Sequence, residues 1–443
     1  MPRRNLLPAF ALACLPMVLA VVPTREADAA TITANNCNDG GSGSLRDAVA
    51  RAASGDTVDL RGLSCPIIRL TSGPIAVAQN DLTLQGAGLS RLLISGNHVD
   101  SVIRHSGTGT LRLLGLTVLW GHREEREALG GCVYSAGNIK AYDVEIRECD
   151  ADGVRVPPRY YRFAAGAGAY AKGDIDISYS GIISNQARAK GAVGGGLYAG
   201  GKLNLRHVVV RNNYAYVGGG VYVVGALSID DAIFRRNRAY INSGAIRTQG
   251  EGPATILNSA IHDNMAHGNS GALGLDGLTD KLIVNSTISG NRAGSWSVGG
   301  ASGHLTITNS TIAFNSAATC HAAMAGTTFH LESTIVADNT CGVGAADQDL
   351  MVLDDNLPPV EGEDNLVTSA NAPLPADTIG ADPMLLPLAD NGGRTQTHAL
   401  ATGSPAIDSG NNEAGLAYDQ RGTGFTRTSG VRTDIGAFER QQP

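Results

Sequence analysis

One pattern of hydrophobic and polar positions recurs through the middle of the chain. An apolar anchor residue is followed by Asn three positions later and by Ala five positions later, and then by a glycine cluster and an apolar pair. Successive anchors lie 24 to 36 residues apart, and the segments between them have no helical periodicity. A repeat of this length predicts a solenoid. The anchors are Ile182, Val210, Phe234, Ile261, Ile288 and Ile312, with weaker copies at Ile146, where Cys149 takes the Asn position, and at Val336 with Asn339.

Each anchor is preceded by apolar or small residues at minus seven, minus five and minus two, such as Leu203, Leu205 and Val208 before Val210. Alternation with period two predicts a strand with one buried face, and the slip of phase before the anchor predicts a bend. We therefore expect coils of about three short strands, stacked ~4.8 Å apart. The predicted fold is all-β, a right-handed parallel β-helix of about ten coils over residues 81–352.

The asparagine of the repeat forms a column, with Asn185, Asn213 and Asn237 as its clearest members. Asparagine tolerates left-handed backbone at a turn, and its amide can bond to the same side chain one coil away. We therefore expect a structural asparagine ladder. Asn285 and Asn309 open Asn-x-Ser/Thr sequons, and we also assign them a structural role.

The two ends of the repeat differ in composition from its middle. Residues 30–80 are expected to form an N-terminal cap, in which a short helix over 44–53 begins at Ser44. Residues 353–380 are proline-rich and acidic and are expected to form a linker. Residues 381–443 are turn-rich and are expected to form a C-terminal cap, because a solenoid's open ends are unpaired strand edges.

The first 29 residues are typical of an export signal. Arg3 and Arg4 precede an apolar run over 6–22, and Ala27-Asp-Ala29 is a small-x-small cleavage site. A removed signal peptide predicts a protein that is secreted or lies at the cell surface. No second apolar run approaches the ~20 residues of a transmembrane helix.

Charge and cysteine content agree with export. Removing residues 1–29 leaves 31 basic and 39 acidic residues, net −8, so nucleic acid is a poor candidate partner. Six cysteines fall into three sequence-local pairs, which suggests three disulfides, although fifteen connectivities are possible. The chain has no Cys-x-x-Cys spacing with histidine partners, so the cysteines do not indicate a zinc site. The favoured pairs are Cys37 with Cys65, Cys132 with Cys149, and Cys320 with Cys341.

Outward positions of adjacent coils should align into columns, and ionisable residues concentrate in the columns between residues 139 and 263. Arginine and histidine beside carboxylates could bind an acidic sugar and abstract a proton next to its carboxylate. The alternative is an exposed ladder in which opposite charges on neighbouring coils prevent repulsion. The candidate catalytic residues are His207, Arg211, Asp231, Arg235, His262 and Asp263, and Arg147 is a candidate for binding.

A tyrosine column stands twelve residues before successive anchors, at Tyr134, Tyr170, Tyr198 and Tyr222. Pointing outward, these rings would form a platform on which sugar rings stack; pointing inward, they would pack in the core. Two polar insertions, 122–127 and 155–162, are expected to form loops flanking the charged columns.

Acidic residues of the tail raise the possibility of calcium, but the Asp-x-Asp-x-Asp-Gly spacing of a calcium loop is missing. Arg394, Arg421 and Arg432 are close enough in sequence to pair with these acids, so we expect no metal and no cofactor, with calcium as the open alternative. The acids are Asp390, Asp408, Asp419 and Asp434.

The two ends also carry a resemblance. Gly43-Ser-Leu-Arg-Asp-Ala-Val-Ala-Arg-Ala-Ala-Ser-Gly-Asp-Thr57 resembles the CSLREA domain. The tail resembles the choice-of-anchor Q domain through Asp390-Asn-Gly-Gly-Arg-Thr-Gln-Thr-His-Ala-Leu400, Gly403-Ser-Pro-Ala-Ile-Asp-Ser-Gly410 and Asp434-Ile-Gly-Ala-Phe-Glu439. The repeats are similar to polymorphic outer-membrane repeats. The resemblance implies a secreted or surface-associated bacterial right-handed β-helix, without naming a reaction.

Two hypotheses about function follow. The first is a non-catalytic β-helix that binds a surface or polysaccharide, as an adhesin or matrix protein does. The second is a carbohydrate-active enzyme, foremost a lyase on acidic polysaccharide. The chain lacks Gly-x-Ser-x-Gly, His-Glu-x-x-His, P-loop and dinucleotide motifs and the Asp-Asp plus Gly-His-Gly set of β-helix pectin hydrolases, which favours binding. The enlarged intervals beside the charged columns favour the enzyme.

Overall fold

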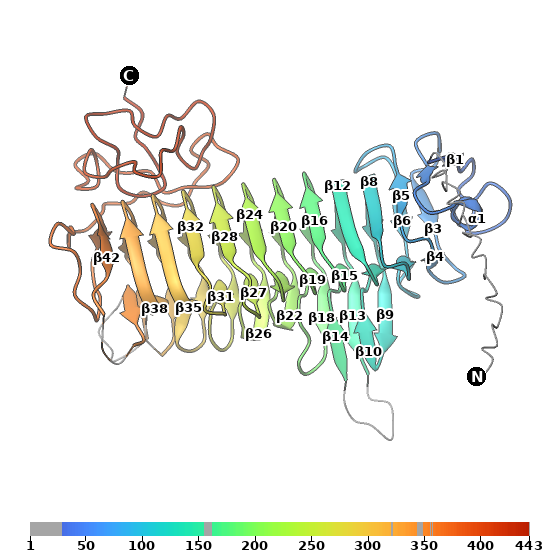
Figure 1. The fold of residues 1–443 in the computed structure, drawn as a ribbon, viewed down its shortest axis with the longest axis horizontal. Coiled ribbons are helices and arrows are strands. Elements are labelled where there is room, and N and C mark those ends of the chain that lie inside the picture. Colours follow the sequence, from blue (N-terminus) through green and yellow to red (C-terminus); the bar gives the residue numbers. More distant parts are fainter. Residues whose placement is uncertain are drawn as a thin grey trace, which may run out of the picture.

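The protein is a long parallel β-solenoid with one short helix (Figure 1). The structure is a computed structural model that describes residues 29–154, 162–319, 322–342, 349–354, 356 and 358–442. The predicted all-β parallel solenoid is confirmed, whereas a typical coil has four short strands instead of the expected three. One such coil runs through β19 (Leu197–Ala199), β20 (Leu203–Arg206), β21 (Val209–Arg211) and β22 (Tyr214–Val217).

Equivalent strands of neighbouring coils pair in parallel and form four strand columns. The first contains β11 (Val133–Ser135), β15 (Ala169–Ala171), β19, β23 (Val221–Val223), β27 (Ile246–Thr248) and β31 (Leu273–Leu275). The second contains β12 (Asn138–Arg147), β16 (Ile175–Ser178), β20, β24 (Leu227–Asp230), β28 (Ala254–Leu257) and β32 (Lys281–Val284).

The third and fourth strand columns carry the candidate functional residues. The third contains β12, β17 (Gly181–Ile183), β21, β25 (Ile233–Arg235), β29 (Ala260–His262), β33 (Thr287–Ser289), β36 (Thr311–Ala313) and β39 (Ile335–Ala337). The fourth contains β9 (His122–Glu125), β13 (Asp150–Gly153), β18 (Gln186–Arg188), β22, β26 (Arg238–Asn242), β30 (Met265–Ala266), β34 (Arg292–Ala293), β37 (Ser316–Ala317) and β40 (Thr340–Cys341).

The first and last coils complete the stack. The first are built from β1 (Thr31–Thr33), β2 (Thr57–Asp59), β3 (Ile67–Arg69), β4 (Ile75–Val77), β5 (Leu82–Gln85), β6 (Leu93–Ser95), β7 (Ile103–His105) and β8 (Thr110–Leu119). The last are built from β35 (Ser297–Thr308), β38 (Ala322–Glu332), β41 (Leu350–Val352), β42 (Glu361–Glu363) and β43 (Leu366–Val367). Two further strands, β10 (Glu127–Leu129) and β14 (Phe163–Ala165), pair beside the fourth column.

The core is one continuous column of apolar side chains on the solenoid axis. The predicted anchors pair Cα opposite Cα from coil to coil, for example Val210 with Phe234 and Phe234 with Ile261, and each of these three is fully buried. Burial of the inward face of every rung makes the register unambiguous, because a shift by one residue would expose the whole apolar set.

The predicted asparagine ladder is also present. Asn185, Asn213, Asn237, Asn264, Asn291 and Asn315 are buried, and each side-chain amide donates to the carbonyl oxygen of the next asparagine at 2.9–3.0 Å. One expectation about them is wrong, because the ladder residues do not have left-handed backbone. The residue just before each one has positive φ instead, as Asn212 and Arg236 do.

Two corners of each coil therefore have left-handed backbone. The first, between the second and third strands, includes Tyr179, His207 and Asp231. The second, between the third and fourth strands, includes Arg236 and Asp263. We call these the first and second corners. Side chains at equivalent corners stand one above another along the solenoid.

The one helix that the structure describes lies at the N-terminal end of the solenoid, while β2, β3 and β4 of the segment expected to form a cap pair as rungs with β5, β6 and β7. Helix α1 (Leu45–Arg51) begins at Ser44, whose hydroxyl accepts a hydrogen bond from the Asp47 backbone N–H at 3.2 Å, and Asp47 in turn accepts one from the Gly43 N–H. Its apolar face, with Leu45 and Val49, is buried in the solenoid core.

The C-terminal end is arranged differently from the expectation. Within 353–380, expected to form a linker, β42 and β43 add another rung to the solenoid. The remaining segment, which we call the C-terminal module (residues 381–442), lies against the side of the later coils instead of across their open end (Figure 1). Its apolar residues Ile435 and Phe438 pack on the outward Ile335 of β39.

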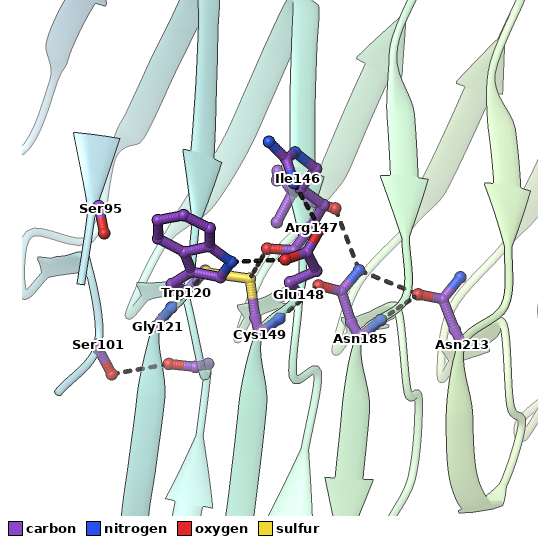
Figure 2. Close-up of a disulfide and its surroundings, with 12 residues drawn as sticks. Ser95, Ser101, Trp120, Gly121, Ile146, Arg147, Glu148, Cys149, Asn185 and Asn213 are labelled. Atoms are coloured by element: carbon purple, nitrogen blue, oxygen red, sulfur yellow. Dashed lines mark hydrogen bonds and ion pairs between the residues drawn. A yellow bond between two sulfur atoms is a disulfide. The ribbon is translucent and has the colours of Figure 1, made fainter. Parts of the chain in front are cut away.

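Two predicted disulfides are present, Cys37–Cys65 and Cys132–Cys149. Figure 2 shows that Cys149 occupies the ladder position ahead of Asn185, and its backbone N–H donates to the Asn185 side chain at 3.2 Å. Cys341 is disulfide-bonded as well. Cys320, residues 1–28 of the predicted signal peptide and residues 155–161 of the predicted insertion lie outside the described residues. The disulfides fit an oxidising compartment.

In the part of the chain that the structure describes, no helix is long and apolar enough to cross a membrane. The polar segment 122–127 was expected to form a loop, but it contributes strands β9 and β10, and β9 pairs with β13 of the next coil. Pairing within the fourth strand column explains this difference. It provides hydrogen-bond partners for the backbone N–H and C=O groups of a segment whose sequence does not alternate between apolar and polar residues.

Candidate functional site

The charged residues predicted to form one patch are distributed over three places. His207 and Asp231 are at the first corner, and Asp263 is at the second corner. Arg211, Arg235 and His262 stand opposite one another on the outward side of the third strand column, between the two corners. Two hollows exist where one patch was expected, one at each corner.

A long groove follows the second corner and the outward side of the fourth strand column, with a volume of about 890 Å³. It extends over seven consecutive coils, from β18 to β40, so it runs along the solenoid axis. We call it the arginine groove. Its lining residues are Gln186, Asn212, Asn213, Tyr214, Arg236, Arg238, Asp263, Asn264, Met265, Gly290, Arg292, Phe314, Ser316 and Thr340.

Three exposed arginines, Arg236, Arg238 and Arg292, give this groove its charge. None of them makes an ion pair with another described residue, whereas several other arginines of the solenoid do. Arg188, for example, pairs with Asp150 at 3.0 Å. A guanidinium without a protein partner presents a planar fork of donors that matches a carboxylate. The groove therefore exposes three guanidinium groups whose hydrogen-bond donors are free of carboxylates from the described residues.

Asp263 is the carboxylate within the arginine groove, and it is held by His262. The Nδ1 atom of His262 lies 3.0 Å from Oδ2 of Asp263. His262 itself is only 4% exposed, and burial lowers its pKa. It is therefore placed to orient Asp263, and its burial leaves it out of reach of a substrate in the groove.

The second hollow is a cleft of about 430 Å³ between the first corner and the C-terminal module. His207 Nδ1 is hydrogen-bonded to Oδ2 of Asp231, and the Arg394 guanidinium of the module donates to the backbone oxygen of Asp231 and lies 3.3 Å from its Oδ1. The ring of Tyr179 stacks on His207 with centroids 4.4 Å apart. The imidazole is therefore held in one orientation from two sides, and we call this hollow the histidine cleft.

The tyrosine column points outward, because the flanking Leu197 and Val221 are fully buried. Its rings stack on one another with centroids 4.7–5.6 Å apart and planes within 8° of parallel. Ring faces that cover one another are not free for a sugar, so the column points outward but does not offer the stacking platform that was one of the two alternatives. Burial raises the pKa of Tyr170 to about 12, in keeping with a packing role.

Arg147 does not lie in either hollow. Its guanidinium pairs with Glu145 at 2.8 Å and also with Glu148. Both carboxylates belong to the same coil as Arg147, so its charge is compensated within that coil and not by opposite charges on neighbouring coils, which face it with Leu119 and Ile183.

The acidic residues of the tail mostly accept hydrogen bonds within the C-terminal module. Asp419 pairs with Arg421 at 2.6 Å as expected, whereas Arg432 reaches Asp364 in the last coils. A different group brings three carboxylates close together, since Glu332, Glu363 and Glu413 have oxygen atoms within 4.8 Å of one another. Burial and the two neighbouring carboxylates raise the pKa of Glu332, and the side chain of Asn411 donates to it.

Sequence reasoning missed the outward position four residues after the anchor, which contributes Arg238 and Arg292 to the arginine groove. The signal was present in the repeat, because this position aligns Gln186, Tyr214, Arg238, Met265 and Arg292 in successive coils. Arg394 was expected to pair within the tail. Its contact with Asp231, 163 residues away, depends on where the module docks.

Fold and groove together define the class: a parallel β-solenoid with a basic groove along its axis. No protein-family model and no curated protein matches the chain. Among solved structures, pectate lyase Pel9A is similar with 14% identity and a TM-score of 0.44 over 93% of this chain and 98% of that one. A mannuronic acid-specific family 6 polysaccharide lyase from human gut microbiota is similar with 11% identity and a TM-score of 0.36 over 75% and 86%. Neither activity is carried over to this chain.

Proposed function

We propose that the protein binds an acidic polysaccharide, whose chain lies in the arginine groove parallel to the solenoid axis. The observation that carries this proposal is the set of three exposed arginines, Arg236, Arg238 and Arg292, without ion-pair partners among the described residues of a seven-coil groove. Other exposed cations of the solenoid, such as Lys140 and Arg188, have carboxylate partners. Three unpaired guanidinium groups that line one groove point to a ligand that supplies the anions.

The spacing of the groove suits a polymer of sugars. Coils repeat every ~4.8 Å along the axis, which is close to the advance per residue of an extended polysaccharide chain. Arg238 and Arg292 stand two coils apart in the same strand column. Met265 lies between them and pairs with Arg238 on one neighbouring coil and with Arg292 on the other. Carboxylates on alternate sugars of such a chain would meet these two guanidinium groups in register, with bidentate hydrogen bonds.

The test compares polygalacturonate, alginate and a neutral glucan as ligands for the full mature chain. Arg238→Ala is expected to weaken binding of the acidic polymers about ten- to a hundredfold, because a charge-assisted hydrogen bond contributes about 1.5–3 kcal/mol. Lys140→Ala serves as the matched control, since Lys140 is exposed and pairs with Asp176 away from the groove. Equal binding by both variants, or equal affinity for the neutral glucan, would refute the proposal. Preferential binding of a polyphosphate would also refute it.

A second candidate function is favoured by the histidine cleft. His207 Nε2 has no partner among the described residues, while Nδ1 is fixed by Asp231, an arrangement typical of a general base. Arg206 and Arg394 at the same cleft could neutralise a sugar carboxylate. The protein would then be a lyase on acidic polysaccharide, acting by β-elimination.

This β-elimination needs no cofactor. His207 takes the proton from the carbon next to the sugar carboxylate, and the electrons of that C–H bond form a double bond to the neighbouring ring carbon. The bond from that neighbour to the glycosidic oxygen breaks, and the leaving oxygen takes up a proton from water. The product is an unsaturated uronate that absorbs in the ultraviolet.

The measurement is the ultraviolet absorbance of polygalacturonate and alginate incubated with the protein. Product made by wild type and lost in His207→Ala, but retained in Lys140→Ala, would support the lyase. No product with either polymer would refute it and leave the binding proposal in place, because binding is measured separately.

A further inference from the structure

A third hollow, of about 600 Å³, adjoins the arginine groove and combines aromatic with basic side chains. We call it the aromatic hollow. It lies at the C-terminal ends of strands β18, β22 and β26 in the fourth strand column. Here the pairing of β22 with β26 shifts register between Ala215 and Val217. Its lining residues are Arg162, Ala187, Arg188, Ala189, Lys190, Tyr214, Tyr216 and Tyr240.

The aromatic side chains of this hollow are more accessible than the tyrosine column described above. Tyr240 is 54% exposed. The rings of Tyr216 and Tyr240 are stacked with centroids 5.2 Å apart, but His267 on the next coil is tilted by 54° to Tyr240 at 6.1 Å. The stack therefore opens at Tyr240, whereas the rings of the tyrosine column remain parallel throughout.

The charge of the hollow is positive. Arg188 is engaged with Asp150 and Asp152 at 3.0 and 3.3 Å, so its guanidinium is not free for a ligand. Lys190 has no ion-pair partner among the described residues. An ammonium group beside exposed tyrosine rings is a combination suited to a sugar ring with an acid group.

The hollow and the groove adjoin at Tyr214, which lines both of them. We propose that the aromatic hollow is a subsite for one end of the same acidic polysaccharide, where a sugar ring packs against Tyr240 and Tyr216 and its carboxylate or sulfate reaches Lys190. This inference rests on the proposed function. It adds that the ligand leaves the line of the solenoid axis at Tyr214.

The test measures the affinity of Tyr240→Ala for acidic oligosaccharides of graded length by calorimetry. Aromatic packing contributes about 0.5–1.5 kcal/mol, so affinity for long oligomers should fall about two- to tenfold. Short oligomers that fit within the arginine groove should bind as they do to wild type. Tyr142→Ala is the matched control, since Tyr142 is 52% exposed on another face of the solenoid and should leave both affinities unchanged.

A length-independent loss in Tyr240→Ala, or no loss at any length, would overturn the aromatic subsite. Lys190→Ala should likewise lower the affinity for long acidic oligomers and leave that for short ones unchanged. It should not change the affinity for neutral oligomers. If Arg238→Ala also leaves binding unchanged, the proposed function itself fails. If Arg238→Ala weakens binding but Tyr240→Ala does not, only the subsite fails.

Discussion

The side-chain amide of Asn213 donates a hydrogen bond to the side-chain oxygen of Asn237 at 2.9 Å, although the two residues are 24 positions apart. The same oxygen accepts the backbone N–H of Asn213 at 3.1 Å. One side chain thus satisfies two donors of the coil before it, and the pattern repeats along the solenoid. The ladder repeats at the spacing of the coils, and the same spacing separates the side chains that line the arginine groove, the histidine cleft and the aromatic hollow.

We expect Asn237→Ala to lower the free energy of unfolding by about 2–4 kcal/mol. The substitution removes the acceptor of Asn213 and the donors to Val210 and Asn264, and it leaves buried polar groups without partners. Urea unfolding followed by circular dichroism measures the change. Asn204→Ala is the control, since Asn204 is exposed on the outward side of β20 and should shift stability by less than about 0.5 kcal/mol.

The sequence was sufficient to predict this ladder because the repeat records contacts directly. Two residues at the same repeat position, such as Val210 and Phe234, must meet when coils stack, so register follows from counting. The same counting anticipated that Tyr198 and Tyr222 would be neighbours. It did not anticipate that their ring faces would cover one another, since stacking depends on side-chain rotation as well as on register.

Corners and docking limited what the sequence could predict about the site. His207 and Asp263 stand only a few positions from their anchors, but left-handed backbone at two separate corners turns them to different sides of the third strand column. The histidine cleft also needs Arg394, which comes from a module outside the repeat. Periodicity carries no information about a segment that does not repeat.

The disulfide Cys132–Cys149 should stabilise the protein by about 3 kcal/mol, because it closes a loop of 17 residues in the unfolded chain. It also fixes the coil from which the asparagine ladder starts, through the hydrogen bond from Cys149 to Asn185. Replacing both cysteines by alanine should shift the urea midpoint accordingly. A shift below about 1 kcal/mol would mean that stacking of the coils alone holds this region together.

Binding of an acidic polysaccharide should weaken as salt is added, since the arginines of the groove are exposed and their field is screened beyond about 8 Å at physiological ionic strength. Replacing Arg236, Arg238 and Arg292 together by glutamine should flatten this dependence. Affinity measured over a range of sodium chloride concentrations gives the slope. Binding that is insensitive to salt in wild type, or an unchanged slope in the triple variant, would contradict a charge-based groove.

The C-terminal module should become less stable as pH rises through neutrality, because of Glu439. Burial raises the pKa of this carboxyl from 4.5 to about 7, although it accepts backbone hydrogen bonds from Ser429 and Asp434. The folded state therefore holds the proton more tightly than the unfolded state. The resulting stability is fully present below pH 4.5 and is lost as pH rises through about 7. Its size is at most about 3 kcal/mol.

Hydrogen exchange of residues 427–439, measured at about pH 5 and about pH 8 and corrected for the intrinsic rate, reports this effect locally. Glu439→Gln keeps one acceptor oxygen and cannot ionise, so its protection should depend less on pH than that of wild type. A residual dependence should remain, because burial also raises the pKa of Asp434. Glu413→Gln provides the exposed control. Protection that increases with pH in wild type, or an identical pH profile in Glu439→Gln, would show that the Glu439 carboxyl does not carry this proton.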